Sequence, residues 1–576
     1  MVTLRGTVAS PGIAFGQAVV YLPRDLSATG VKSRGKDQET VRLGEAIERA
    51  LGELSALTEK VKSEASVELA HIFRSQQTIV EDDSIRGEMN AEIAATGCSA
   101  EAAVEKIFGQ YHAMFEELGE KDYNRARIAD LEDVRRRLMR KLLGVEEVDL
   151  SHLEPATIVV APDLLPSDTA VMDRANVCGM ITETGGITSH TAILAKTLGI
   201  PAAVSVAGAS QQIAVHEEVI LDSSSPEGAR IYVNPDSQTR YRLSELSRRR
   251  EERISLLAAE TRKEPVTPDG HRMILSANIG APEDLDTASE HGVTSVGLFR
   301  TEFLFMKSAR LPTEEVQYDA YRAVCNRLSG GMVVIRTLDA GGDKAIPSLA
   351  LPREANPFLG YRALRVSLEN REMFKTQLRA ALRASAGADV RIMFPMVCGL
   401  EDWRRAHAVL EEARGELAER RQPFNERLQV GVMVEIPSAV FMADELAAEV
   451  DFMSIGTNDL TQYLLAADRM NEHVSAYYRP FHPAVIRAIH RVVEAAHRRG
   501  KWVGVCGELA GMPLAIPVLM GMGVDELSMS PRSLPEVRHV ILGTKYSQAQ
   551  SLAQNVLTIK DTDALEAEIR RNFAKE

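Results

Sequence analysis

Two different hydrophobic patterns divide the first part of the chain. Residues 2–22 alternate apolar and polar positions, which predicts strands, and Ser10-Pro11-Gly12 separates them with a turn. Residues 24–154 contain no proline and place apolar side chains at helical spacing, for example Leu43, Ile47 and Leu54. This second pattern predicts a helical bundle, with breaks near glycines 97 and 119.

The pattern changes again after residue 155. Short β-rich runs separated by glycines cover residues 157–161, 177–182, 202–206, 219–222 and 230–233. We therefore expect an α/β domain formed by residues 1–23 and 146–236, with residues 24–145 as a helical insertion. Residues 241–262 are charged and helical in pattern, and we expect residues 237–262 to be a helical linker.

The remaining region, residues 263–576, repeats apolar runs that are mostly separated by charged helical segments. Eight such runs are present: 273–278, 295–299, 332–337, 390–395, 430–435, 452–456, 502–507 and 526–530. Eight strand–helix units predict a (β/α)₈ TIM barrel. The fold class is therefore multidomain α/β.

Composition narrows the class of protein. The 576 residues carry a net charge of -14, which argues against general nucleic-acid binding. The five cysteines show no CxxC pair or zinc spacing, which favours a reducing compartment. The N-terminus has no signal-peptide pattern and no apolar run has membrane-spanning length, so we expect a cytoplasmic protein without membrane insertion.

The segment Thr184-Gly185-Gly186-Ile187-Thr188-Ser189-His190-Thr191 carries candidate chemistry. It follows a predicted strand and opens a predicted helix over 191–198, which Gly199 and Pro201 end. His190 is therefore expected in the first turn of a helix, where free N–H groups and the helix dipole favour an anion. An imidazole in that position is able to accept a phosphoryl group, although a lone histidine there is more often a capping or packing residue.

Polar residues follow the predicted barrel strands, at the end where barrel active sites lie. These residues are Arg300, Arg336, Glu435, Asn458, Asp459, Arg469 and Cys506. Arginines bind phosphate and carboxylate, while Glu435 and Asp459 offer the oxygen ligands that Mg²⁺ prefers. We expect a small anionic substrate, and Cys506 is a candidate proton donor or acceptor.

The chain resembles Enzyme I of the bacterial phosphotransferase system, the phosphoenolpyruvate–protein phosphotransferases. The resemblance covers nearly the whole length and rests on eight segments together: 9–16, the Gly-Gly-x-Thr-Ser-His segment ending at His190, 297–305, 336–339, 356–360, 431–435, 454–463 and 506–510.

This resemblance implies a reaction and a set of roles. Phosphoenolpyruvate and Mg²⁺ would bind the barrel, and His190 would accept the phosphoryl group and pass it to a histidine-containing phosphocarrier protein. The resemblance also implies that the helical insertion docks this carrier, that the histidine domain swings, and that the barrel forms a homodimer. The implied roles are substrate binding by Arg300, Arg336, Asn458, Asp459 and Arg469, metal binding by Glu435 and Asp459, and protonation of the enolate by Cys506. Arg362 is a further candidate for contact with the phosphate.

Two positions depart from the family pattern. Ile187 stands where the family often has arginine, so less positive charge is available near a phosphorylated His190. Gln76 ends a segment that usually closes in histidine. We interpret it either as a change in carrier docking or as a neutral surface change.

Two other functions remain open from the sequence. A dikinase or synthase of the pyruvate–phosphate class shares the histidine domain and barrel, but no glycine-rich ATP loop is recognisable here. A regulatory scaffold without turnover is the second, and the presence of His190, Cys506 and the metal carboxylates argues against it.

Overall fold

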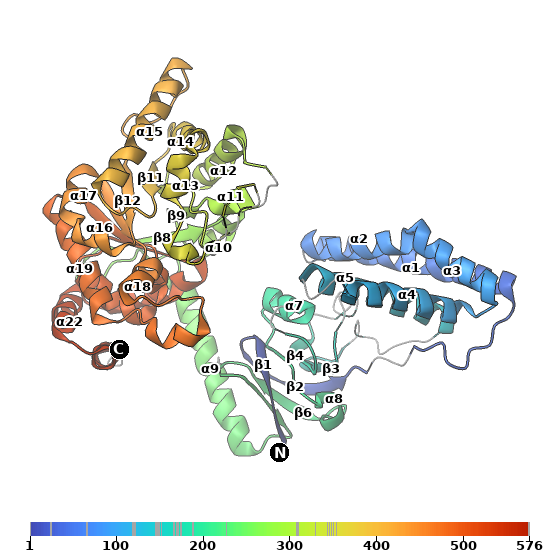
Figure 1. Cartoon of the computed structure of the whole chain (residues 1–576). Helices are drawn as coiled ribbons and strands as arrows, with labels where there is room; N and C mark the ends of the chain where they lie inside the picture. The colour runs from blue at the N-terminus through green and yellow to red at the C-terminus, as the bar shows by residue number, and fades with distance from the viewer. Residues whose placement is uncertain are drawn as a thin grey trace. The chain divides into compact units, whose positions relative to one another are not determined.

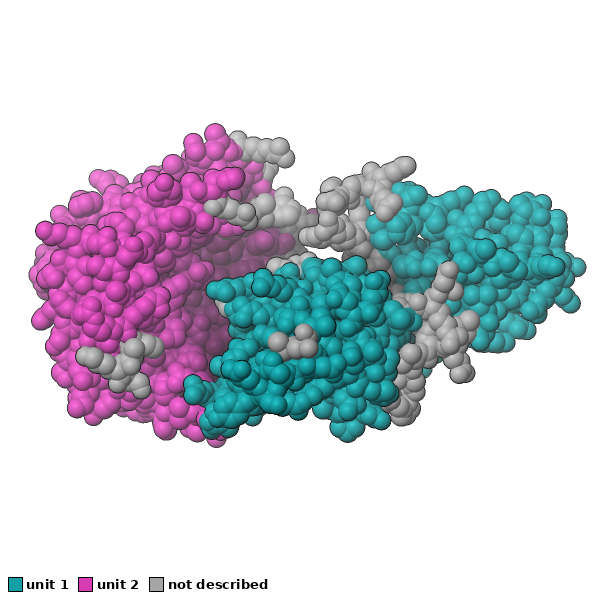
Figure 2. All heavy atoms as spheres, turned by 90° about the horizontal axis from the view of Figure 1, so that it is seen from below, with its two compact units in different colours: residues 1–251 teal, residues 252–576 magenta. Residues whose placement is uncertain are grey.

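The structure is a computed structural model, shown in Figure 1. It describes residues 2–22, 26–64, 67–117, 122–144, 150, 153–164, 168, 172, 175–186, 189–225, 227–306, 310–328, 330–342, 344, 346, 348–349, 351–352 and 354–573. Side chains are not described at 60–64, 67–72, 116–117, 122–126, 129, 190, 197, 472 and 573. The chain forms two compact units, residues 1–251 and 252–576, which Figure 2 colours separately.

In unit 1, seven strands close into a small mixed barrel. The strands are β1 (Val2–Ser10), β2 (Ile13–Val20), β3 (Thr157–Ala161), β4 (Val177–Thr182), β5 (Ala202–Val204), β6 (Glu218–Asp222) and β7 (Ala229–Val233), in the order β1-β5-β4-β3-β2-β6-β7. β2 to β5 pair in parallel through β3 and β4, while β1, β6 and β7 pair antiparallel. The strands expected from the sequence are therefore present, with bounds that differ by at most two residues.

Between β2 and β3 the chain forms long helices around a hydrophobic core of their own. They are α1 (Lys36–Glu64), α2 (Val67–Glu81), α3 (Asp83–Thr96), α4 (Ala100–Glu117) and α5 (Asp122–Leu143). The break at Gly97 is confirmed: this residue ends α3 in the left-handed conformation, with φ 67°. The break expected near Gly119 lies outside the described residues. Two short helices, α7 (His190–Leu198) and α8 (Ala209–Gln212), lie among the later strands in sequence, and α9 (Ser237–Glu260) follows β7.

Unit 2 is a closed barrel of eight parallel strands, which confirms the (β/α)₈ prediction. The strands are β8 (Ile274–Ile279), β9 (Val296–Arg300), β10 (Val333–Arg336), β11 (Val390–Phe394), β12 (Val430–Val434), β13 (Phe452–Ile455), β14 (Trp502–Val505) and β15 (Glu526–Met529). Each one begins and ends within two residues of its predicted run. Strands such as β12 are buried at every position, because side chains fill the barrel on one face and helices cover the other.

Helices surround this barrel. They are α10 (Leu285–Glu290), α11 (Glu302–Met306), α12 (Glu314–Arg327), α13 (Leu364–Glu369), α14 (Arg371–Ala384), α15 (Leu400–Glu419), α16 (Pro437–Phe441), α17 (Ala443–Glu449), α18 (Thr457–Leu465), α19 (Pro483–Arg498), α20 (Ile516–Gly521), α21 (Leu534–Gly543), α22 (Tyr546–Thr558) and α23 (Thr562–Phe573). In the part of the chain that the structure describes, no helix combines the length and the apolar character needed to cross a membrane.

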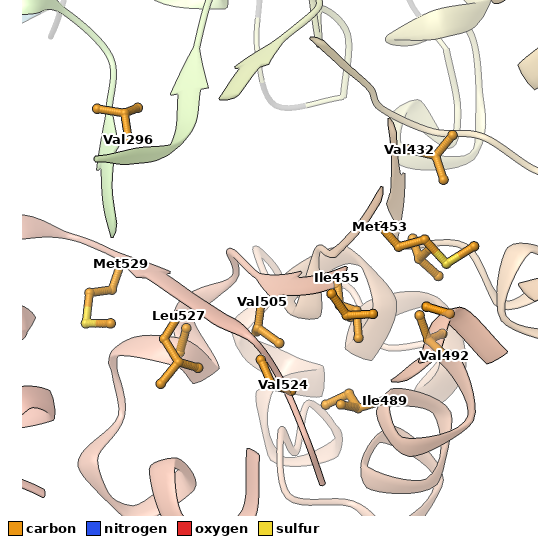
Figure 3. Packing of buried hydrophobic residues seen from close by; sticks show 14 of the residues in the cluster. Val296, Val432, Met453, Ile455, Ile489, Val492, Val505, Val524, Leu527 and Met529 are labelled. Carbon is orange, nitrogen blue, oxygen red and sulfur yellow. The ribbon is translucent and has the colours of Figure 1, made fainter. Parts of the chain in front are cut away.

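Helix α19 shows why these segments are helical. Pro483 occupies its first turn, where no hydrogen-bonded N–H is needed, and the His482 side chain accepts a hydrogen bond from Ala484 N–H. Ile489 and Val492 are buried on one face of the helix, and Figure 3 shows them packed near Val505 and Ile455 of the barrel strands. Apolar residues at helical spacing thus join α19 to the common core of unit 2.

Candidate active site

A cavity of about 480 Å³ lies at the carboxyl ends of the strands in unit 2. Its lining includes all seven barrel residues that the sequence singled out: Arg300, Arg336, Glu435, Asn458, Asp459, Arg469 and Cys506. Leu298, Met433 and Cys506 belong to the apolar cluster that fills the barrel interior. The cavity is therefore a charged pocket that borders the apolar barrel core.

Arg300 is the last residue of β9 and is mostly buried. Its guanidinium has no hydrogen bond or ion pair with any described residue. Burial and the neighbouring Arg336 lower the pKa of Arg300, since both disfavour its positive charge. A cation held in this way is available to an anion that enters the cavity.

Arg336, at the end of β10, is held by two buried carboxylates. Its Nη2 donates to Glu302 Oε1 at 2.7 Å, and its Nη1 lies 3.1 Å from Asp339 Oδ2. Lys344 Nζ donates to the same two carboxylates at 2.8 Å each. Burial opposes the charge of Asp339, but Lys344 and Arg336 together hold the pKa of this carboxyl well below its usual range. The network fixes Arg336 at the cavity, and its Nε has no hydrogen-bond partner in the described part of the chain.

Arg362 is fully buried and does not line the cavity. Its Nη2 donates to Asp339 at 3.0 Å and lies 3.6 Å from Asp459 Oδ2. Its Nη1 donates to the hydroxyl of Tyr463 at 3.2 Å. The structure therefore shows Arg362 bound to carboxylates beside the cavity, and phosphate contact by this residue stays a prediction.

Glu435 follows β12 and its carboxylate is buried. Met396 N–H donates to Glu435 Oε1 at 2.6 Å. Burial and the nearby carboxylate of Asp459 raise the pKa of Glu435 to about 8. Two carboxylates that disfavour each other's charge, beside a cavity, fit a divalent cation. Among the described residues no group of three or more His, Cys, Asp or Glu side chains is arranged to hold a metal ion.

Helix α18 and the turn after it supply three further lining residues of the cavity. Asn458 Oδ1 accepts a hydrogen bond from Glu508 N–H at 2.8 Å, which fixes the side-chain amide. Arg469 Nη1 lies 3.4 Å from Asp459 Oδ1. Asn458, Asp459 and Arg469 therefore reach the cavity from one helix and its C-terminal turn.

Cys506 follows β14 and is 3% exposed. Burial raises the pKa of its thiol to about 11, so the sulfur carries its proton at neutral pH. The next residue has to be glycine, because a Cβ on Gly507 would lie 2.0 Å from Thr457 Oγ1. This close approach lets the end of β14 meet the start of α18.

His190 is the first residue of α7, as the sequence predicted. Ser189 caps the helix by accepting from Ala192 N–H at 3.3 Å, and Gly199 ends it in the left-handed conformation. The backbone thus places His190 at a helix N-terminus, in unit 1. Its side chain and Ile187 lie outside the described part of the structure.

Gln76 is fully buried in the helical region. Its Nε2 donates to Asp133 Oδ2 at 2.9 Å, which joins α2 to α5. The interpretation of Gln76 as a surface residue is therefore wrong, and an effect on carrier docking stays a prediction.

Lys344, Met470, Tyr478 and Glu508 also line the cavity, and the sequence assigned none of them a role. Lys344 stood in a run of polar residues after the third predicted strand, which was a usable signal. Tyr478 follows Arg469 by nine residues, and nothing in its local pattern distinguishes it. Its hydroxyl donates to the carbonyl of Asn458 at 3.4 Å.

Comparison with known proteins identifies the family. Residues 5–127, 153–225 and 255–546 match the families described as PEP-utilising enzyme, N-terminal, mobile domain and PEP-binding domain, respectively. The phosphoenolpyruvate-protein phosphotransferase of Bacillus subtilis (strain 168) is 42% identical over 576 residues, which is 100% of both chains. That of Enterococcus faecalis (strain ATCC 700802 / V583) is 41% identical over 98% of this chain and 97% of its own. The chain belongs to the phosphoenolpyruvate-protein phosphotransferase family.

Proposed function

We propose that this protein transfers the phosphoryl group of phosphoenolpyruvate to His190 and then to a histidine-containing phosphocarrier protein, releasing pyruvate, as the first step of a sugar phosphotransferase system. The observation that carries the proposal is the convergence of seven barrel residues, singled out from the sequence, on one cavity. Family membership supports the same reaction.

The cations of the cavity suit a substrate that bears both phosphate and carboxylate. Arg300 offers a guanidinium that pairs with none of the described residues, and Arg336 is fixed beside it by Glu302. Arg469 and the amide of Asn458 line the same cavity and supply further donors. Phosphoryl transfer depends mainly on positioning and charge stabilisation, which these groups provide.

Glu435 and Asp459 are the residues that would hold Mg²⁺. They are neighbouring hard-oxygen donors on the cavity, and Asp459 Oδ1 has no hydrogen bond among the described residues. When bound, the ion would neutralise charge on the substrate oxygens. Mg²⁺ commonly takes one or two carboxylates together with substrate phosphates, which matches this pair.

The proposed phosphoryl transfer begins at the His190 ring and ends with protonation of the enolate. A ring nitrogen of His190 bonds to phosphorus, and the bond between phosphorus and the enol oxygen breaks. The enolate then takes a proton on its terminal carbon from the thiol of Cys506, which gives pyruvate, and the thiolate regains a proton from water. A thiol with a pKa of about 11 is protonated before the reaction, as a proton donor must be.

The reaction requires His190 to visit two partners. The donor cavity belongs to unit 2, whereas His190 begins α7 in unit 1. We propose that the α/β domain that carries His190, residues 1–23 and 146–236, swings between the barrel and the carrier bound to the helical insertion, and that the region of α9 takes part in this motion. The helical region α1–α5 is the proposed docking surface for the carrier.

Two family properties complete the proposal. We expect a homodimer formed through the barrel. We also expect a cytoplasmic location, since all five cysteines are free thiols, as a reducing compartment would keep them.

The test uses phosphoenolpyruvate labelled on phosphorus, Mg²⁺ and a panel of small histidine-containing carrier proteins. The proposal predicts that label passes to a carrier and that pyruvate appears in equal amount. Pyruvate without transfer to any carrier, or no turnover at all, would contradict it. A parallel reaction with labelled ATP and no phosphoenolpyruvate separates the dikinase, which would label the chain from ATP.

A further inference from the structure

The segment Asn356-Pro357-Phe358-Leu359-Gly360 has no task in the reaction described above, although it is one of the family motifs. Residues Pro357–Leu359 form the short 3₁₀ helix η2, in the connection between β10 and α13. The Phe358 ring lies beside two arginines of the site. The guanidinium carbon of Arg469 is 5.7 Å from the ring centroid, and that of Arg362 is 5.6 Å away. Both distances fall within the range of about 6 Å for a cation–π contact.

The ring is held in place by its own backbone and by neighbouring loops. Tyr463 Oη donates to the carbonyl oxygen of Phe358 at 2.5 Å, and Arg362 donates to the same hydroxyl. Gly342 leaves space for the ring, since a Cβ there would lie 3.3 Å from Phe358 Cδ1. Phe358 is thereby fastened to α18, the helix whose first turn carries Asn458 and Asp459.

We propose that Phe358 is a positioning residue, whose ring face orients the Arg469 guanidinium toward the substrate cavity while also contacting Arg362. This inference rests on the proposed function, because it assigns Arg469 to the binding of phosphoenolpyruvate. Arg469 lines the cavity and Phe358 does not, so the ring acts through the arginine.

The physical advantage of a ring over a carboxylate is that it attracts a cation without cancelling its charge. The ion pair of Arg469 with Asp459 is long, at 3.4 Å. Asp459 is also a proposed metal ligand, and a bound cation would draw on the same oxygens. The quadrupole of Phe358 carries no net charge, so the contact with the ring does not reduce the attraction of Arg469 for a phosphate or carboxylate group.

The experiment compares Phe358→Leu, which removes the ring, with Phe358→Tyr, which keeps it. The Phe358 ring lines a second cavity, of about 320 Å³, which differs from the substrate cavity. A matched control is Phe441→Leu, because the Arg491 guanidinium lies 5.7 Å from the exposed Phe441 ring, which does not line the substrate cavity. Steady-state kinetics with phosphoenolpyruvate, Mg²⁺ and a carrier give KM and kcat. Calorimetry of phosphoenolpyruvate with Mg²⁺ gives Kd, using the same variants in a His190→Ala background that cannot turn over.

Loss of the ring should raise both KM and Kd about three- to tenfold, the range for a cation–π contact at a partly exposed site, with kcat within about twofold of wild type. Phe358→Tyr should restore the wild-type KM, and Phe441→Leu should not change it. Phe358→Leu combined with Arg469→Lys should cost less than the sum of the two single changes, because both disturb one contact.

The inference is overturned if wild type turns over while Phe358→Leu keeps its KM. It is also overturned if Phe358→Tyr is as impaired as Phe358→Leu, or if the double variant is additive, since the residue would then act only through packing. A wild-type protein that neither binds nor uses phosphoenolpyruvate would contradict the proposed function itself, which is a separate and recognisable result.

Discussion

Replacing Cys506 by alanine tests how pyruvate is formed. The thiol is 3% exposed, lines the substrate cavity and has its pKa raised by burial to about 11. A pH of 7 is about four units below this pKa, so only on the order of 1 in 10,000 molecules carries the thiolate. The group is therefore ready to give a proton, and a positioned acid contributes about 10²- to 10⁴-fold to a rate.

Cys506→Ala should lower the steady-state rate of pyruvate release by about 10²- to 10⁴-fold. A single turnover should still place label on His190, because bonding of nitrogen to phosphorus needs no proton from the thiol. Pyruvate is measured continuously by a coupled reduction in the presence of excess carrier. The label on His190 is measured by electrophoresis without acid, since phosphohistidine is acid-labile.

Cys325→Ala is the matched control for this measurement. Cys325 is also buried, with a thiol whose pKa burial raises to about 11, but it lies on α12 and does not line the cavity. Pyruvate release by Cys506→Ala at a rate close to that of Cys325→Ala would refute the assignment of the acid. A parallel loss of pyruvate and of single-turnover label would show that Cys506 serves binding instead.

Three further predictions follow from buried carboxylates of the barrel. Glu435→Ala or Asp459→Ala should block labelling by phosphoenolpyruvate while circular dichroism stays unchanged, and undiminished labelling in either variant would remove that residue from the metal site. Asp339→Asn leaves Arg336 and its neighbours short of a buried counter-charge, so the barrel should lose about 3–5 kcal/mol in thermal or urea unfolding, and a loss below about 0.5 kcal/mol would contradict the network. Glu526 is buried and its pKa is raised to about 7, so the folded protein favours the protonated carboxyl and loses stability as pH rises from about 4.3 to 7. Glu526→Gln should therefore raise the free energy of unfolding by about 3 kcal/mol at pH 8 and by about 1 kcal/mol at pH 5. An equal gain at both pH values would disprove this link between protonation and stability.

The barrel was predictable because its strands are buried on both faces. β12 is a continuous apolar run that Glu435 follows directly, and β13 is mostly apolar, with Asn458 three residues after its end. Since the carboxyl ends of parallel strands meet on one face of a barrel, sequence order alone was sufficient to bring these residues together. The small barrel of unit 1 was harder to predict, because short strands such as β5 (Ala202–Val204) carry little pattern.

The sequence did not determine which residue forms an ion pair with each charged side chain of the site. Arg300 and Arg336 both end strands, yet Arg300 pairs with no residue that the structure describes, whereas Arg336 lies between Glu302 and Asp339. That difference depends on the fold of the connection after β10, which returns Lys344 to the same carboxylates. The burial of Gln76 likewise depends on how two helices cross, and a helical pattern does not determine this crossing.

The most direct measurement is the location of the phosphoryl group after one turnover. The protein is incubated with labelled phosphoenolpyruvate and Mg²⁺, digested at alkaline pH, and mapped by mass spectrometry beside the His190→Ala variant. We expect one modified peptide, phosphorylated at His190, and no such peptide from the His190→Ala variant. Label on another residue, or label that persists in His190→Ala, would contradict it.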